Sequence, residues 1–134
     1  MLRTLLGLAA GLAVAIVTVM IVETIGHQLF PPPRGYDMTQ ASAEALPFST
    51  LLWPVIAWFL GSLAGSALAV HLSRQGWTGW AVAALVLAGT IFNFAMIAHP
   101  LWVMIAGAIA PILGGLLGQQ LGGRTRREVY RVAL

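Results

Sequence analysis

The chain carries four long apolar segments, separated by short polar stretches. They span residues about 4–29, 48–70, 77–98 and 100–121. A membrane-crossing helix needs roughly 20 mostly apolar residues, and each segment meets that length. The segments lack the alternation of barrel strands, and lipid admits only helices or closed barrels. The pattern predicts an all-α integral membrane four-helix bundle that forms a single transmembrane domain over residues 1–134.

Composition supports a lipid-facing surface. The sequence is 59% hydrophobic and 8% charged, whereas soluble domains carry about 25% charged residues. A pI of about 10.7 could indicate nucleic-acid binding. However, the arginines cluster at the predicted helix ends, so we expect the lipid bilayer as partner and no nucleic acid. The chain contains no cysteine, which excludes disulfides and thiolate metal sites.

The arginines also predict the orientation. An even number of spans places both termini on one side, together with six of the seven arginines; only Arg34 lies opposite. Cytoplasmic loops carry the excess of positive charge. We therefore expect both termini and a tail over 122–134 to be cytoplasmic, and a loop over 31–47 to lie outside.

The outer loop begins with three prolines that end the first helix. Asp37 and Gln40 have the spacing of a capping box, which predicts a short helix over 38–46. On the same side, only His99 and Pro100 separate the last two spans. These two helices are therefore expected to form a tight antiparallel hairpin.

Small residues recur every four positions in three of the spans. Such stripes let helix backbones approach closely. The glycines concerned are Gly7, Gly11, Gly61, Gly65, Gly114 and Gly118. They fit packing within one bundle, but three stripes also suggest a homo-oligomer or a partner in a larger membrane complex.

The candidate site lies at the outer end of the first span. Glu23 and His27 are four residues apart and so share one helix face. A carboxylate at membrane depth is costly unless it is protonated, paired or faces water. Asn93 and His99 belong to the outer ends of other spans, and Asp37 to the outer loop. We treat these five residues as the candidate ligand or proton site.

Several chemistries fit this site. It could be a hydrogen-bonded staple between helices, because polar residues also join helices. It could be a proton- or substrate-coupled transport site. A metal ion is a third candidate, with Glu23, His27 and His99 as ligands. Haem is disfavoured because the two histidines of similar depth both lie near the outer edge. His71 belongs to the inner end of the second span and is expected to be solvated.

Catalytic motifs are absent. The sequence contains no Walker loop, GxSxG, HExxH or CxxC pattern. No nucleophile-and-base arrangement stands out either. We therefore do not expect an enzyme.

The stretch ETIGHQLFPPPRGYD, with the later AWFLGSLAGS and IAHPLW, resembles a group of small four-span bacterial membrane proteins that carry a GHxL[FY]PPP-type segment. The resemblance covers most of the chain. It implies four spans and a bacterial inner membrane, and it brings no catalytic residues with it.

These observations predict a small polytopic inner-membrane protein of the binding or transport type. Its outer-leaflet Glu/His site would handle a proton, a cation or a small ligand. The alternative is a structural or accessory subunit that packs through its glycine-rich helix faces. The two hypotheses predict different surroundings for Glu23. A binding or transport site requires a cavity that reaches Glu23, whereas a staple between helices requires Glu23 to be shielded from water and hydrogen-bonded.

Overall fold

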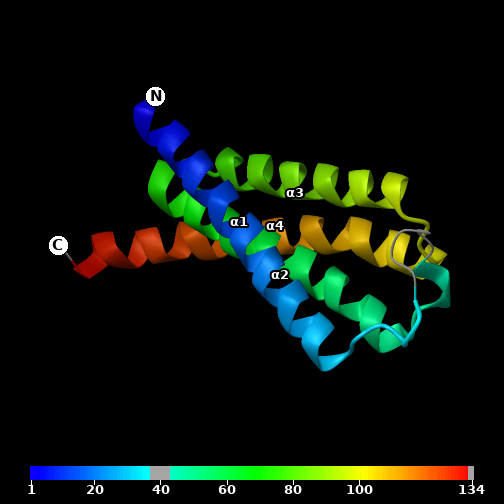
Figure 1. Cartoon of the computed structure of the whole chain (residues 1–134). Coiled ribbons are helices and arrows are strands. Elements are labelled where there is room, and N and C mark those ends of the chain that lie inside the picture. Colours follow the sequence, from blue (N-terminus) through cyan, green and yellow to red (C-terminus); the bar gives the residue numbers. More distant parts are fainter. Residues whose placement is uncertain (37–42, 133–134) are drawn as a thin grey trace.

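The computed structural model describes the backbone of residues 1–36 and 43–132, and the side chains of residues 1–36 and 43–124. The elements in this part of the chain are α1 (Leu2–Leu29), the short 3-10 helix η2 (Ala43–Ala45), α2 (Phe48–Ser73), α3 (Trp77–Met96) and α4 (Leu101–Val132). The four α-helices are long and apolar enough to cross a membrane. Both chain termini lie at the same end of the bundle (Figure 1). The prediction of an all-helical bundle with four candidate spans is confirmed.

The helix boundaries lie within three residues of the prediction, except at the end of α4. The segment expected as a separate tail, 122–134, continues α4 as helix to Val132. Gly122 lies within this helix and packs against α2, where an added Cβ would lie 2.5 Å from the Ala67 carbonyl oxygen. The third helix ends two residues early, and Ile97 is extended.

The outer loop is described only in part. The proposed capping residues Asp37 and Gln40 lie outside the described residues. Of the helix expected over 38–46, the structure describes the last part, which forms the 3-10 helix Ala43–Ala45. The Ala43 N–H donates a hydrogen bond of 2.7 Å to the carbonyl of Ala98. This bond fastens the loop to the connection between α3 and α4.

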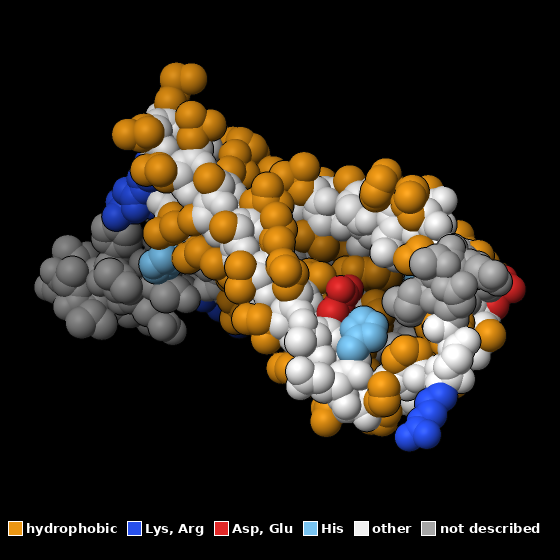
Figure 2. All heavy atoms as spheres, in the orientation of Figure 1, with side chains coloured by type: hydrophobic (Ala, Val, Ile, Leu, Met, Phe, Trp, Pro, Cys, Tyr) orange, Lys and Arg blue, Asp and Glu red, His pale blue; other side chains and the backbone are white. Residues whose placement is uncertain are grey.

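Helix α2 is the centre of the bundle. It packs extensively along α1 and α4 and also contacts α3. The hairpin of α3 and α4 is less extensive than the packing of α4 on α2, although their connection is short. Many large apolar side chains of the described residues are exposed, as expected where lipid is the solvent, and Figure 2 shows them over one face of the molecule.

The glycine stripes make these helix contacts within one chain. Gly7 and Gly11 of α1 pack against the backbone of α2 at Gly65, Ala69 and Ser73. Glycines of α4 approach the opposite side of α2: Gly114 meets the Phe59 carbonyl, Gly118 the Leu63 carbonyl. A Cβ added at Gly61 would lie 2.9 Å from the carbonyl oxygen of Ala15. Packing inside the bundle accounts for all three stripes, so they give no separate reason to expect a homo-oligomer.

Buried hydroxyl groups add hydrogen bonds between the helices. Ser62 donates to the carbonyl of Pro111 in α4 at 2.7 Å. One turn later, Ser66 donates to the carbonyl of Gly79 in α3 at 2.8 Å. Because an unpaired hydroxyl in an apolar interior is unfavourable, these bonds fix the register of α3 and α4 on α2.

Candidate functional site

A polar cavity lies at the end of the bundle where α1 ends and α4 begins. Its volume is about 150 Å³. The lining includes four of the five residues expected at the site: Glu23, His27, Asn93 and His99. Asp37 lies outside the described residues. The structure therefore brings together side chains from α1, α3 and the α3–α4 connection that are far apart in sequence.

Within this polar cavity, His27 is held by its own helix. Its ring Nδ1 donates a hydrogen bond of 2.8 Å to the main-chain carbonyl of Glu23. A carbonyl oxygen only accepts, so Nδ1 carries the proton in the neutral ring. The other nitrogen, Nε2, then has a free lone pair and accepts hydrogen bonds or binds a cation.

His99, in the connection between α3 and α4, also uses Nδ1 in a bond to the main chain. Its Nδ1 donates a hydrogen bond of 2.6 Å to the carbonyl of Ile97. The ring also stands edge-on to Phe94, with centroids 5.4 Å apart. The extended backbone at Ile97 presents this carbonyl beyond the end of α3. In the neutral form, His99 therefore also has Nε2 as an acceptor.

Glu23 is half-buried and close enough to His27 for an electrostatic interaction. Figure 2 shows a carboxyl group beside an imidazole in a hollow among apolar side chains. The Glu23 carboxyl group thus borders the polar cavity beside His27.

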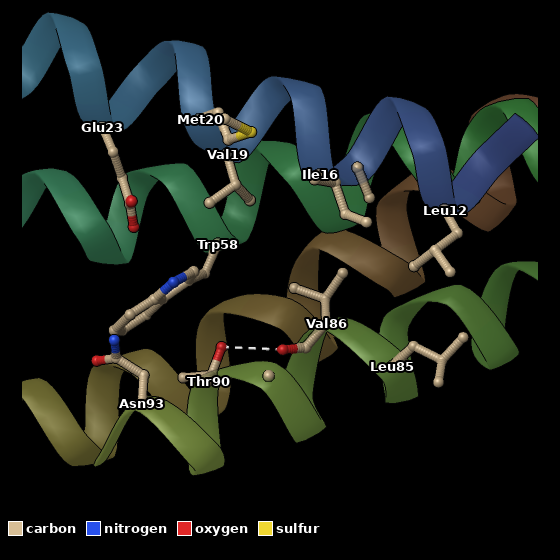
Figure 3. A pocket seen from close by; sticks show the side chains of 12 residues that line it. Leu12, Ile16, Val19, Met20, Glu23, Trp58, Leu85, Val86, Thr90 and Asn93 are labelled. Carbon is tan, nitrogen blue, oxygen red and sulfur yellow. Dashed lines mark hydrogen bonds between the residues drawn. The ribbon is translucent and has the colours of Figure 1, made fainter. Parts of the chain in front are cut away.

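A second cavity, of about 410 Å³, adjoins the first. It lies between α1 and α3, and Glu23, Trp58 and Asn93 line both cavities. Figure 3 shows Glu23 reaching from α1 towards Asn93 on α3, with the Trp58 ring of α2 in the space between them. Away from these residues the second cavity is lined by apolar side chains such as Leu12 and Leu85.

The sequence analysis missed Trp58, because one tryptophan within an apolar span resembles any other lipid-facing residue. The structure leaves it only 6% exposed and places it edge-on to Phe94, at 5.6 Å between centroids. Gly107 of α4 makes room for it, since a Cβ there would lie 2.5 Å from the indole ring. Tyr36 and Thr50, which also line the polar cavity, were missed as well.

The donor set does not favour a metal centre. In the part of the chain that the structure describes, no three His, Asp or Glu side chains come close enough to hold one ion. Glu23, His27 and His99 share a cavity without converging on one point. His71, in the last turn of α2, is exposed, in line with its expected solvation.

The polar cavity thus combines one carboxyl group with two imidazole rings whose Nδ1–H groups are bonded to main-chain carbonyls. Such a set binds groups that donate protons or carry positive charge. Comparison with known protein families, curated proteins and solved structures gives no match for this chain, so any functional assignment rests on this geometry.

Proposed function

We propose that this protein is an inner-membrane protein of the binding or transport type, which takes a proton-donating or cationic ligand into the polar cavity. The observation that carries the proposal is the acceptor set of Glu23, His27 and His99. In both imidazoles the Nδ1–H group donates a hydrogen bond to a main-chain carbonyl, which leaves Nε2 for the ligand. Glu23 supplies the negative charge.

The burial of Glu23 supports binding over a purely structural role. Ionisable side chains at membrane depth usually mark ion or substrate pathways. A staple would use the carboxyl group in hydrogen bonds to other helices, whereas Glu23 borders two cavities. The proposal places both termini in the cytoplasm, on the basis of the arginine distribution, so that the cavity lies near the outer leaflet.

Binding of butylamine, a small cation at neutral pH, tests the proposal. We would titrate it by calorimetry into nanodiscs that carry the wild type, Glu23→Gln or Glu44→Gln. Glu44 is the matched control, because it is an exposed acid of the outer loop. Charge-assisted hydrogen bonds contribute about 1.5–3 kcal/mol. We therefore expect Glu23→Gln to weaken binding roughly tenfold or more.

The control variant decides the interpretation. Glu44→Gln is expected to bind butylamine as the wild type does. Equal loss in both variants would point to non-specific attraction by negative charge. Absence of saturable binding to the wild type would rule out the proposed site.

A further inference from the structure

We propose that the cavity between α1 and α3 holds the apolar chain of a single-chain cationic amphiphile, in its simplest form a long-chain primary amine. Its ammonium head would lie against Glu23 in the polar cavity. This inference rests on the proposed function, because the head occupies the same polar cavity. It adds the chemical class of the ligand.

The lining of the α1–α3 cavity changes from polar to apolar along its length. Glu23 and Asn93 lie at one end, and Leu12 and Leu85 mark the other. The hydroxyl of Thr90 donates a hydrogen bond of 3.0 Å to the Val86 carbonyl of its own helix. Its proton is therefore not available to a ligand. Beyond the polar end, the cavity therefore offers a ligand only apolar contacts (Figure 3).

The dimensions fit one chain. Glu23 and Leu12 are about 16 Å apart along α1, because a helix rises about 1.5 Å per residue. The volume of about 410 Å³ lies in the range of about 300–1,000 Å³ found for small-molecule sites. A two-chain lipid would exceed a cavity of this size, whereas an alkyl chain of roughly twelve carbons spans its length.

The space is kept open by small residues. Gly89 borders the cavity on α3, and a Cβ at this position would meet nothing within 4 Å. Ala15 lines the α1 side. Helix α1 packs mainly on α2 and only slightly on α3, so the cavity faces the bilayer between α1 and α3. A chain can enter from the lipid by this route without crossing a polar region.

Charge selects the head group. A phospholipid or a fatty acid would place a negative group beside the Glu23 carboxylate, which is unfavourable in a low-dielectric site. A primary ammonium group instead donates hydrogen bonds, which the Glu23 carboxylate and the Nε2 atom of the neighbouring His27 accept. The geometry therefore favours an alkylamine over the ordinary lipids of the bilayer.

The test compares dodecylamine, butylamine and dodecanoic acid in nanodiscs, with empty nanodiscs subtracted. We expect the wild type to bind dodecylamine at least about tenfold more tightly than butylamine, as a buried alkyl chain adds affinity. Dodecanoic acid should not show saturable binding. A dodecylamine with a diazirine near its tail should label peptides of α1 and α3 around Leu12 and Leu85.

Gly89→Leu tests the proposed site of the alkyl chain, the tail site, separately from the site of the ammonium group in the polar cavity, the head site. The added side chain fills the cavity, so dodecylamine binding should fall to the level of butylamine while butylamine binding stays unchanged. Ala88→Leu is the matched control, because Ala88 is exposed one position away and does not line the cavity. Leu85→Trp, from the same cavity wall, provides a second blocking variant if Gly89→Leu folds poorly.

The outcomes distinguish the two proposals. If butylamine binds and depends on Glu23, but the blocking variants leave dodecylamine binding unchanged, only the tail site is rejected. Labelling spread evenly over all lipid-facing helices, or equal binding of dodecanoic acid, rejects it too. If butylamine shows no saturable binding, the proposed function fails and the amphiphile site falls with it.

Discussion

Gly11 of α1 and Gly65 of α2 face each other with no side chain between them. A Cβ on Gly11 would lie 2.6 Å from the Gly65 carbonyl oxygen, and a Cβ on Gly65 would lie 2.5 Å from that of Gly11. The two backbones are thus in direct contact. In lipid, where apolar side chains gain little by meeting one another, such close packing is a main source of helix association.

Gly11→Ala is expected to destabilise the bundle by about 1–3 kcal/mol, the usual cost of overpacking. The new methyl group would meet backbone atoms of α2, which cannot move away as a flexible side chain could. Unfolding of the purified protein by increasing sodium dodecyl sulphate, followed by circular dichroism, measures the change.

Gly123→Ala is the control for Gly11→Ala, since a Cβ at Gly123 meets nothing within 4 Å. Its stability should change by less than about 1 kcal/mol, because alanine favours a helix over glycine by about that much. Equal stability of Gly11→Ala and the wild type would contradict the close approach of α1 and α2.

Ser62→Ala removes the bond from α2 to the Pro111 carbonyl of α4. Hydrogen bonds between membrane helices contribute about 0.6 kcal/mol on average and up to about 1.7, so we expect a loss in that range in the same unfolding assay. Thr24→Val is the comparison, because Thr24 is exposed and bonds only within its own helix, to the Met20 carbonyl. A larger loss in Thr24→Val than in Ser62→Ala would be inconsistent with the observed register of α2 and α4.

The two site histidines should share one tautomer. Both donate from Nδ1 to main-chain carbonyls, so their neutral rings should carry the proton on Nδ1. Nitrogen-15 NMR of the imidazoles distinguishes the two tautomers directly. His71, which is exposed, serves as the internal reference without such a bond. Protonated Nε2 in neutral His27 or His99 would remove the acceptor on which the proposed function depends.

Purified protein should hold no stoichiometric transition metal and should be colourless. Within the described residues, no three candidate ligands come together. Elemental analysis and an absorption spectrum of the wild type, beside Glu23→Ala and His27→Ala, check this expectation. A metal that is present in the wild type and lost in both variants would contradict it and would make Glu23 and His27 ligands.

Topology explains why much of the site could be predicted from sequence. The i, i+4 spacing set Glu23 and His27 on one face of α1, and alternation of the spans brought His99 and Asn93 to the same end. These inferences need only helix geometry and the number of crossings. Trp58 could not be found this way, because its role depends on which helix faces it and on the space left by Gly107.

The helix arrangement was less predictable. The short connection predicted a tight antiparallel hairpin of α3 and α4, but α4 packs more extensively on α2 than on α3. The reason is that α2 carries small residues on more than one face, with Gly61 and Gly65 towards α1 and Ser62 and Ser66 towards α4 and α3. Hydrophobic patterning cannot show this, since lipid-facing and buried positions are equally apolar.

Because α2 is the centre of the bundle, the α1–α2 hairpin packs far more extensively than the α3–α4 hairpin. A fragment that ends after α2 would already contain the Gly11–Gly65 contact and the scaffold for the remaining helices. A fragment made of α3 and α4 alone would lack the surface on which α4 mainly packs. During synthesis, the chain would therefore complete its framework with the second helix, and the last two helices would be recruited to it one after the other.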